Sequence, residues 1–214
     1  MSRISAYAAL LAGCLAACSQ PIDPPTAEPV AILSAYADKV PGKWLLLVDA
    51  AAANAAPEAS GTRCSEFDSP LDLSRTFTGT AEATFRTVAD DIHISDHPPS
   101  RAELASGGYT GVVALRVTRL HTSVKTDGLI EAHASADAEI DASIVVTKGG
   151  DRMVESTQSG KGEAERDAKL DCSGAATAVS AASGAAMQDM TRKLAEQFAN
   201  SHAVRYSVPG LAPQ

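Results

Sequence analysis

Strict alternation of apolar and polar residues marks the centre of this chain. Every second residue from Ile130 to Val146 is apolar, and the residues between them are polar as far as Ser143. A period of two predicts a long strand with one buried and one solvated face. A second apolar run, rich in Val, Leu and Thr, ends just before Asp127-Gly128, which is a typical hairpin turn. A two-residue turn there would place Leu115 opposite Ile140.

Near that turn, several polar residues would face the alanines of the partner strand: Arg119, His121, Ser123 and Lys125. We therefore expect that the hairpin tip projects beyond the core, or that a β-bulge between Thr118 and Leu120 changes the buried face. A second tight turn is expected at residues 148–151. A more polar strand should follow it, from Arg152 to about Gly162.

Helical periodicity marks two main segments and a short one. Apolar residues spaced by three or four predict an amphipathic helix over residues 79–92 and a long helix over residues 173–201. Alanines dominate the first half of the long helix, so we expect it to lie close against the alanine face of the central strand. Ser100 and Glu103 match a capping box that opens a short helix, which should stop at Gly107-Gly108.

These elements predict a single α+β domain over residues 43–208. An apolar run at 43–49 indicates a buried first strand, a loop should occupy residues 50–75, and a short last strand is expected at 203–208. The order of elements favours a two-layer sandwich. In it, two main helices cover an antiparallel or mixed sheet that contains the long hairpin.

The start of the chain has a different pattern. An arginine at position 3 precedes an uncharged run from Ile4 to Ala17. This run is shorter than the roughly 20 residues that span a bilayer and has the length of a secretory signal. It ends in Leu15-Ala16-Ala17-Cys18, which resembles the lipobox of bacterial lipoprotein precursors. The resemblance implies that residues 1–17 are removed and that Cys18 becomes a lipidated amino terminus in the cell envelope.

Two alternatives to that cleavage are an ordinary secretory signal and a second lipobox-like sequence, Leu11-Ala12-Gly13-Cys14. Ser19 follows Cys18, where an aspartate would resemble an inner-membrane retention signal. The resemblance therefore implies the periplasmic face of the outer membrane. Prolines favour an extended tether over residues 18–42 that holds the domain clear of the lipid, and residues 209–214 indicate a flexible tail.

Cys64 and Cys172 are the two cysteines that remain after this processing. An oxidising compartment favours a disulfide between them. It would close a loop of about a hundred residues, for which chain entropy gives roughly 4–5 kcal/mol. The alternatives are two separate buried thiols or a catalytic cysteine, but a catalytic cysteine needs a base partner and no Cys-His signature is visible.

Composition narrows the function classes. The chain is 45% hydrophobic but only 4% aromatic, so the core should gain area through close approach of backbones. A formal net charge of −8 argues against nucleic acid, which is bound by basic surfaces. The same charge predicts no broad attraction to anionic lipid.

Histidines are the first candidates for a metal site. His93, Asp96 and His97 could supply nitrogen and carboxylate ligands, but a polar loop before two prolines is the favoured interpretation. His121 and His133 lie on neighbouring predicted strands. In the predicted register they point to opposite faces, which argues against a shared site.

An acidic strand face could perform acid-base chemistry or bind calcium, but a solvated face is the simpler interpretation: Glu131, Asp137, Glu139 and Asp141. The Gly160-Lys161-Gly162 sequence lacks the spacing and the hydroxyl residue of a phosphate loop. No Gly-x-Ser-x-Gly elbow occurs in the chain. We therefore expect no catalytic residue, metal or cofactor.

Two stretches resemble small envelope lipoproteins. Residues 104–115 are similar to a helix-glycine-strand step of these proteins, and Gly160-Lys161-Gly162 with the alanine-rich helix after it is similar to a later one. The families are the YajG-type lipoproteins, the curli secretion lipoprotein and the penicillin-binding-protein activator lipoproteins. The resemblance covers residues 43–200 in pattern and implies no catalytic residue.

The sequence thus predicts a non-enzymatic envelope lipoprotein that acts as an adaptor or assembly factor. It would bind another envelope protein through a sheet edge, the hairpin tip or the acidic face. The alternatives are a periplasmic binder of a small ligand or lipid, and an enzyme without a recognisable motif. A deep apolar pocket would favour the binder, whereas a filled alanine core with an exposed sheet edge would favour the adaptor.

Overall fold

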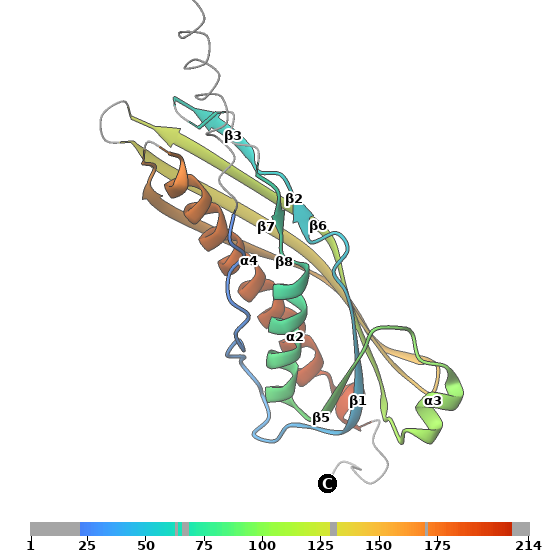
Figure 1. Cartoon of the computed structure of the whole chain (residues 1–214). Helices are drawn as coiled ribbons and strands as arrows, with labels where there is room; N and C mark the ends of the chain where they lie inside the picture. Colours follow the sequence, from blue (N-terminus) through green and yellow to red (C-terminus); the bar gives the residue numbers. More distant parts are fainter. Residues whose placement is uncertain (1–21, 63, 66–68, 129–131, 170, 207–214) are drawn as a thin grey trace, which may run out of the picture.

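The computed structural model describes residues 22–62, 64–65, 69–128, 132–169 and 171–206. A mixed six-stranded sheet forms one layer, and helices cover one of its faces (Figure 1). The predicted α+β sandwich is confirmed. The strands of the sheet are β1 (Val40–Asp49), β3 (Glu58–Gly61), β5 (Ala89–Ser95), β6 (Gly111–Asp127), β7 (His133–Lys148) and β8 (Asp151–Asp167).

Parallel and antiparallel pairing meet in this sheet, whose order is β5-β1-β6-β7-β8. β1 pairs in parallel with β5 and with β6, whereas β6, β7 and β8 pair antiparallel. β3 adds a short parallel pairing at the far end of β6. β2 (Asn54–Ala55) and β4 (Leu71–Asp72) form a separate two-stranded ladder.

The helical layer consists mainly of α2 (Ser74–Val88) and α4 (Ser173–Asn200). Phe198 of α4 contacts both Trp44 of β1 and Phe85 of α2, with ring centroids 5.3 and 5.5 Å apart. This aromatic cluster joins the two helices to the sheet. Elsewhere the interface of α4 with β7 and β8 is built largely from alanines that are at most 5% exposed: Ala134, Ala136, Ala138, Ala142, Ala175, Ala178, Ala182 and Ala186.

The hairpin is present, but its register differs from the prediction. Leu115 pairs with Ile144 rather than Ile140, and Asp127 pairs with His133. The connection is therefore longer than the two residues expected from Asp127-Gly128. From Val112 to Val117 the register is displaced by four positions from the prediction, and because four is an even number, Leu115 still shares a face with the apolar residues of β7.

Of the two alternatives for the hairpin, a projecting tip or a β-bulge between Thr118 and Leu120, the structure contains the bulge, because the register shifts between Val117 and Arg119. Before the bulge, Val117 and the residues at even spacing from it face the helices. After it, Leu120 and Val124 do so, while His121 turns to the open face. The extra residue explains why the polar positions near the tip do not face the alanines.

The first half of the chain contains the main corrections. The helix expected over 79–92 spans Ser74–Val88, and the residues that follow it form β5. Ile92 fits a helical period, but it lies beside Trp44 in a parallel pair with β1. Tertiary pairing thus overrides the local pattern. The predicted loop at 50–75 includes β2, β3 and β4.

The helix predictions for residues 100–106 and 173–201 are confirmed. α3 (Arg101–Ser106) begins with the predicted capping box, in which Ser100 and Glu103 satisfy each other's backbone N–H groups. The strand expected at 203–208 is wrong for its described part, because His202–Tyr206 forms the short helix α5. In this helix the side chain of Arg205 donates back to α4 and to the chain before β1.

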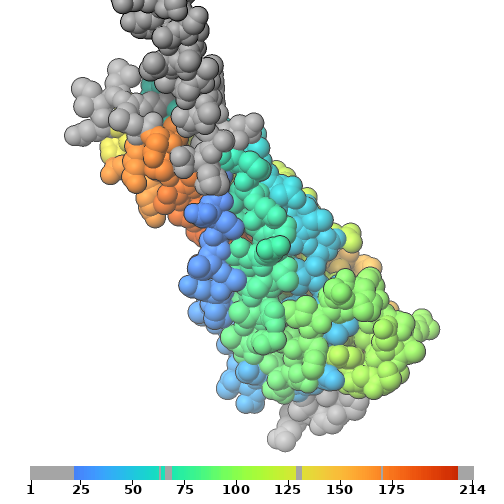
Figure 2. All heavy atoms as spheres, viewed as in Figure 1, coloured from blue at the N-terminus to red at the C-terminus, as the bar shows by residue number. Residues whose placement is uncertain are grey.

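Residues 22–39 differ most from the expected tether. We call them the N-terminal segment. They form no helix or strand, yet they lie along the surface of the helical layer (Figure 2), and residues 40–42 already belong to β1. Ile22 is buried and Ile32 packs against the core. The segment is therefore part of the folded body rather than a free spacer.

Candidate functional site

The predicted lipidation site, Cys18, lies outside the residues that the structure describes, as do the signal sequence and the tail at 209–214. The boundary at residue 17 therefore stays a prediction. Among the described residues, no helix combines the length and hydropathy needed to cross a bilayer.

Cys64 and Cys172 form the disulfide that the sequence predicted. Their Cα atoms lie 5.8 Å apart, and 108 positions separate them in the chain. Cys64 follows β3, and Cys172 is the residue before the first turn of α4. The bond therefore ties the strand beside the hairpin tip to the start of the longest helix. The two cysteines act as a structural link, not as a thiol site.

The first histidine cluster does not converge on one point. His93 Nε2 lies 3.0 Å from Asp91 Oδ1, whereas His97 Nδ1 lies 2.7 Å from Asp96 Oδ1. His97 Nε2 also approaches Glu103 of the α3 capping box at 3.6 Å. No group of three metal-ligating side chains occurs among the described residues.

Electrostatics around His97 follow from these contacts. A hydrogen bond to Asp96, then one to Glu103, raises the pKa of His97 above its usual value. The same pair lowers the pKa of Asp96. The pKa of Glu103 is lowered chiefly by the hydrogen bond from the backbone of Ser100. All three groups are exposed, so they stabilise a surface turn.

His121 and His133 lie on the same open face of the sheet, which corrects the prediction that they point to opposite faces. The bulge after Val117 causes the difference, because it reverses the orientation of the later residues of β6. His121 is paired with Glu139, six positions along β7 from His133. That separation is about 20 Å at the rise of a strand, so the two rings share no ligand.

The acidic face is partly neutralised by Arg119. Its Nε donates to Asp141 Oδ2 at 2.8 Å, and its Nη2 lies 3.4 Å from Glu139 Oε1. Ser159 Oγ donates to the same Glu139 oxygen at 3.0 Å. Asp137 lies further along this face, and Glu131 is outside the described residues. The arrangement is a solvated, cross-paired strand face.

Gly160 and Gly162 serve the packing of α4. A Cβ at Gly160 would lie 2.1 Å from the carbonyl oxygen of Ala186, and a Cβ at Gly162 would lie 2.1 Å from that of Ala182. The helix backbone therefore rests directly on β8. The glycines of the Gly160-Lys161-Gly162 sequence allow the backbone of α4 to lie close to β8, and the sequence is not a phosphate loop.

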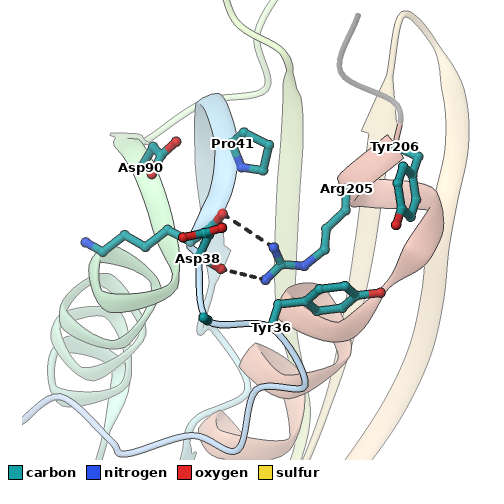
Figure 3. Close-up of a pocket in the computed structure, with 8 residues that line it drawn as sticks. Tyr36, Asp38, Pro41, Asp90, Arg205 and Tyr206 are labelled. Atoms are coloured by element: carbon teal, nitrogen blue, oxygen red, sulfur yellow. Dashed lines mark hydrogen bonds between the residues drawn. The ribbon is translucent and has the colours of Figure 1, made fainter. Parts of the chain in front are cut away.

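A hollow of about 760 Å³ lies between the end of the N-terminal segment and α5. Figure 3 shows the residues that line it. Arg205 crosses its wall. The guanidinium donates to the carbonyl oxygens of Ala199, Asp38 and Lys39 at 2.6, 3.0 and 3.4 Å, and it stacks 3.9 Å from the ring of Tyr36. Burial lowers the pKa of Arg205 from its usual value. Its hydrogen bonds hold the chain together, so they supply no obvious anion site.

A second hollow, of about 480 Å³, lies beside α3 on the sheet face away from α4. Apolar side chains dominate its wall: Leu47, Pro98, Pro99, Leu104, Tyr109 and Val112. Lys43 Nζ lies 4.6 Å above the Tyr109 ring and donates to Gly107 O at 3.1 Å. The volume falls within the range of small-ligand pockets, so this groove is the feature that favours a binder.

The outer edge of β8 is a long sheet edge, because β8 is the last strand in the sheet order of the described residues. No strand among the described residues pairs with it over its 17 residues. Side chains of α4 cover its centre, where Lys193 Nζ donates to Ser159 O at 2.7 Å and Lys161 N donates to Asp189 Oδ2 at 3.3 Å. Lys193 and Asp189 also pair with each other at 2.7 Å. We call these two residues the edge clamp.

The edge clamp was not identified from the sequence. Its signal was present, since Asp189 and Lys193 are four residues apart on a helix and such pairs interact. The pattern alone does not reveal that both side chains reach a strand edge. Arg205 was missed because nothing local distinguishes a buried arginine from a surface one.

No family model matches the chain, and no curated protein matches it. Protein XCC0632 of Xanthomonas campestris, of the DUF330 family, is a similar solved structure, with 9% identity over 84% of this chain and 94% of that one, and a TM-score of 0.41. The hypothetical protein CT253 of Chlamydia trachomatis is 10% identical over 72% and 96%, with a TM-score of 0.31. A neuraminyllactose-binding hemagglutinin homolog of Helicobacter pylori is 11% identical over 88% and 87%, with a TM-score of 0.33. These likenesses are too distant to transfer a function to this chain.

Proposed function

We propose that this protein is a non-enzymatic lipoprotein of the cell envelope that acts as an adaptor for another envelope protein. In this proposal Cys18 carries the lipid, and the mature protein lies on the periplasmic face of the outer membrane. The partner binds as an extended segment along the outer edge of β8. No metal or cofactor is part of the proposal.

The observation that carries the proposal is the free edge of β8. An exposed edge presents backbone N–H and C=O groups that an added strand can pair with. The edge clamp occupies the groups of Ser159 and Lys161. Alternate residues of a strand point their backbone groups to the same side, so Glu155 and Thr157 offer free groups there. The segment Asp151–Gln158 is therefore the binding edge.

Two further features support an adaptor. Alanines of α4 and β7 fill the space between the helix and the sheet and are buried there. Charged residues along β8 oppose uncontrolled pairing between copies, because charges at an edge protect it from aggregation. Asp151, Arg152 and Glu155 provide such charges on the binding edge itself.

Photo-cross-linking on intact envelopes tests the proposal. A photoreactive residue at Glu155 should capture one envelope protein, identified with its cross-linked peptide by mass spectrometry. Thr157→Pro removes an outward N–H and should abolish capture, because proline is tolerated at an edge but cannot donate. Glu163→Pro is the matched control beyond the edge clamp and should leave capture intact.

All variants must retain the wild-type melting transition. Equal capture by the wild type and by Thr157→Pro would refute strand addition at the binding edge. The lipid anchor would be refuted if Cys18→Ala stayed membrane-bound like the wild type and mass spectrometry found no added acyl chains in either the wild type or the variant. The alternative function, a periplasmic binder of a small ligand or lipid, is favoured by the groove beside α3. It predicts that Tyr109→Ala, and not Thr157→Pro, alters the molecules that copurify.

A further inference from the structure

The N-terminal segment begins on the first half of α4. Ser180 Oγ donates to the carbonyl oxygen of Asp23 at 2.6 Å, and Ile22 is only 6% exposed. Gly184 leaves room for Pro25, since a Cβ at this glycine would lie 3.1 Å from Pro25 Cβ. The segment is thus held at its very first described residues.

The rest of the segment follows α4 toward its C-terminus. Leu33 N donates to Glu196 Oε1 at 3.0 Å, and Ala35 N donates to Asn200 Oδ1 at 2.7 Å. On the other side, Val30 N donates to Thr84 Oγ1 of α2 at 3.0 Å. Thirteen residues, from Asp23 to Ala35, therefore accompany the helix from residue 180 to residue 200, about 30 Å at the helical rise.

This docking limits how far the body can lie from a lipid on Cys18. Four residue steps separate Cys18 from Ile22. At most about 14 Å can be spanned by four steps of a fully extended chain, whatever conformation the residues adopt. Instead of the expected tether over residues 18–42, only three residues lie between Cys18 and the docked Ile22.

The docked residues Ile22 and Asp23 lie near one end of the molecule. Ser180 is eight residues from Cys172, or about 12 Å along the helix. Cys172 is bonded to Cys64. Two positions before Cys64, Thr62 donates its N–H to Thr126 O of the β6–β7 hairpin. We call this region the hairpin end. The opposite end, at the turn between β7 and β8, is about 50 Å away along the 16 residues of β7.

From this geometry we propose that the hairpin end faces the surface of the lipid bilayer and that the β7–β8 turn projects away from it. The inference rests on the proposed lipid anchor at Cys18. At the hairpin end, Lys125 pairs with Asp127 at 2.8 Å, and His133 Nδ1 lies 3.4 Å from Asp167 Oδ1. In this arrangement acyl chains hold the protein at the membrane, and the binding edge of β8 lies well away from the bilayer.

Energy transfer to the membrane tests this orientation. The mature lipoprotein is reconstituted into phosphatidylcholine vesicles that contain a rhodamine-labelled lipid, with a donor fluorophore at residue 127 or at residue 151. We expect loss of donor emission at residue 127 and little loss at residue 151. Equal loss at both sites, or greater loss at residue 151, would overturn the orientation.

Undocking variants test the role of the N-terminal segment. Gly79→Leu with Gly184→Leu should displace it, because added Cβ atoms would lie 2.9 Å from Ala27 and 3.1 Å from Pro25. The difference between the two donors should then shrink. Gln188→Leu changes an exposed position of α4 and should leave the difference unchanged. If the folded double variant keeps the wild-type difference, the segment does not set the orientation.

A separate arm distinguishes this inference from the anchor itself. Mass spectrometry of the native protein detects acyl chains on Cys18, and their absence refutes the proposed anchor. The oxidised chain beginning at Cys18 is then coupled through that thiol to a maleimide-bearing lipid in the same vesicles. Donor loss confined to residue 127 would support the geometry without the native lipid, and equal loss at both sites would refute it.

Discussion

Gly160 of β8 and Ala186 of α4 are in direct backbone contact, since a Cβ added to the glycine would lie 2.1 Å from the alanine carbonyl oxygen. We therefore expect Gly160→Ala to push the helix from the sheet and to lower the free energy of unfolding by about 2 kcal/mol, as in overpacked cores. Urea denaturation measures this change. Thr157→Ala, at an exposed position of the same strand, is the control. Equal stability of both variants would contradict the close contact.

Loss of the disulfide should weaken the hairpin end. For the 108-residue separation of Cys64 and Cys172, the double serine variant should unfold with a free energy lower by about 2–5 kcal/mol. Reduced wild-type protein should match the variant, and dithiothreitol should leave the variant's urea midpoint unchanged. A wild-type midpoint that does not respond to reduction would show that the bond adds no stability.

Arg205 should be needed as an arginine. The carbonyl groups of Ala199, Asp38 and Lys39 each accept from a different nitrogen of the guanidinium, and the single nitrogen of a lysine cannot reach all three. Arg205→Lys should therefore lower the melting temperature and destabilise the protein by about 1.5–3 kcal/mol, the range for a hydrogen bond to a charged group. Thermal denaturation provides the measurement. Arg192→Lys, on the surface of α4, should have a much smaller effect. Similar losses for both variants would rule out a special role for the buried guanidinium.

His97 should titrate above its ordinary value of about 6.5, because it hydrogen-bonds first to Asp96 and then to Glu103. Its pKa is raised on folding, so its contribution is complete below the unfolded pKa and disappears as the pH rises through the folded pKa. NMR titration of the ring should show the raised pKa, and Asp96→Asn should lower it. A pKa of His97 that Asp96→Asn leaves unaltered would contradict the assignment.

Local signals predicted the second half of the fold well. The alternation from Ile130 to Val146 produces β7 with the expected buried face, and the polar residues after Val117 indicated a bulge that the structure contains. The register between β6 and β7 could not be predicted, because it depends on the length of the connection after Asp127. The first half was less predictable, since β5 is stabilised by pairing with β1 more than by its own pattern.

Among the site features, the sequence determined those that depend on residue type alone. The expectation of an exported chain with two remaining cysteines predicted the bond between Cys64 and Cys172, and the alanine and glycine positions allow α4 to lie on β8. Only the tertiary structure decided where the prolines of the N-terminal segment lie and which atoms cover the edge of β8. Proline prevents helix wherever it occurs, but whether an extended segment is solvated or docked depends on partners such as Ser180 and Asn200, more than 150 residues away. Such distant contacts exist only after the helices have packed, and no local pattern contains them.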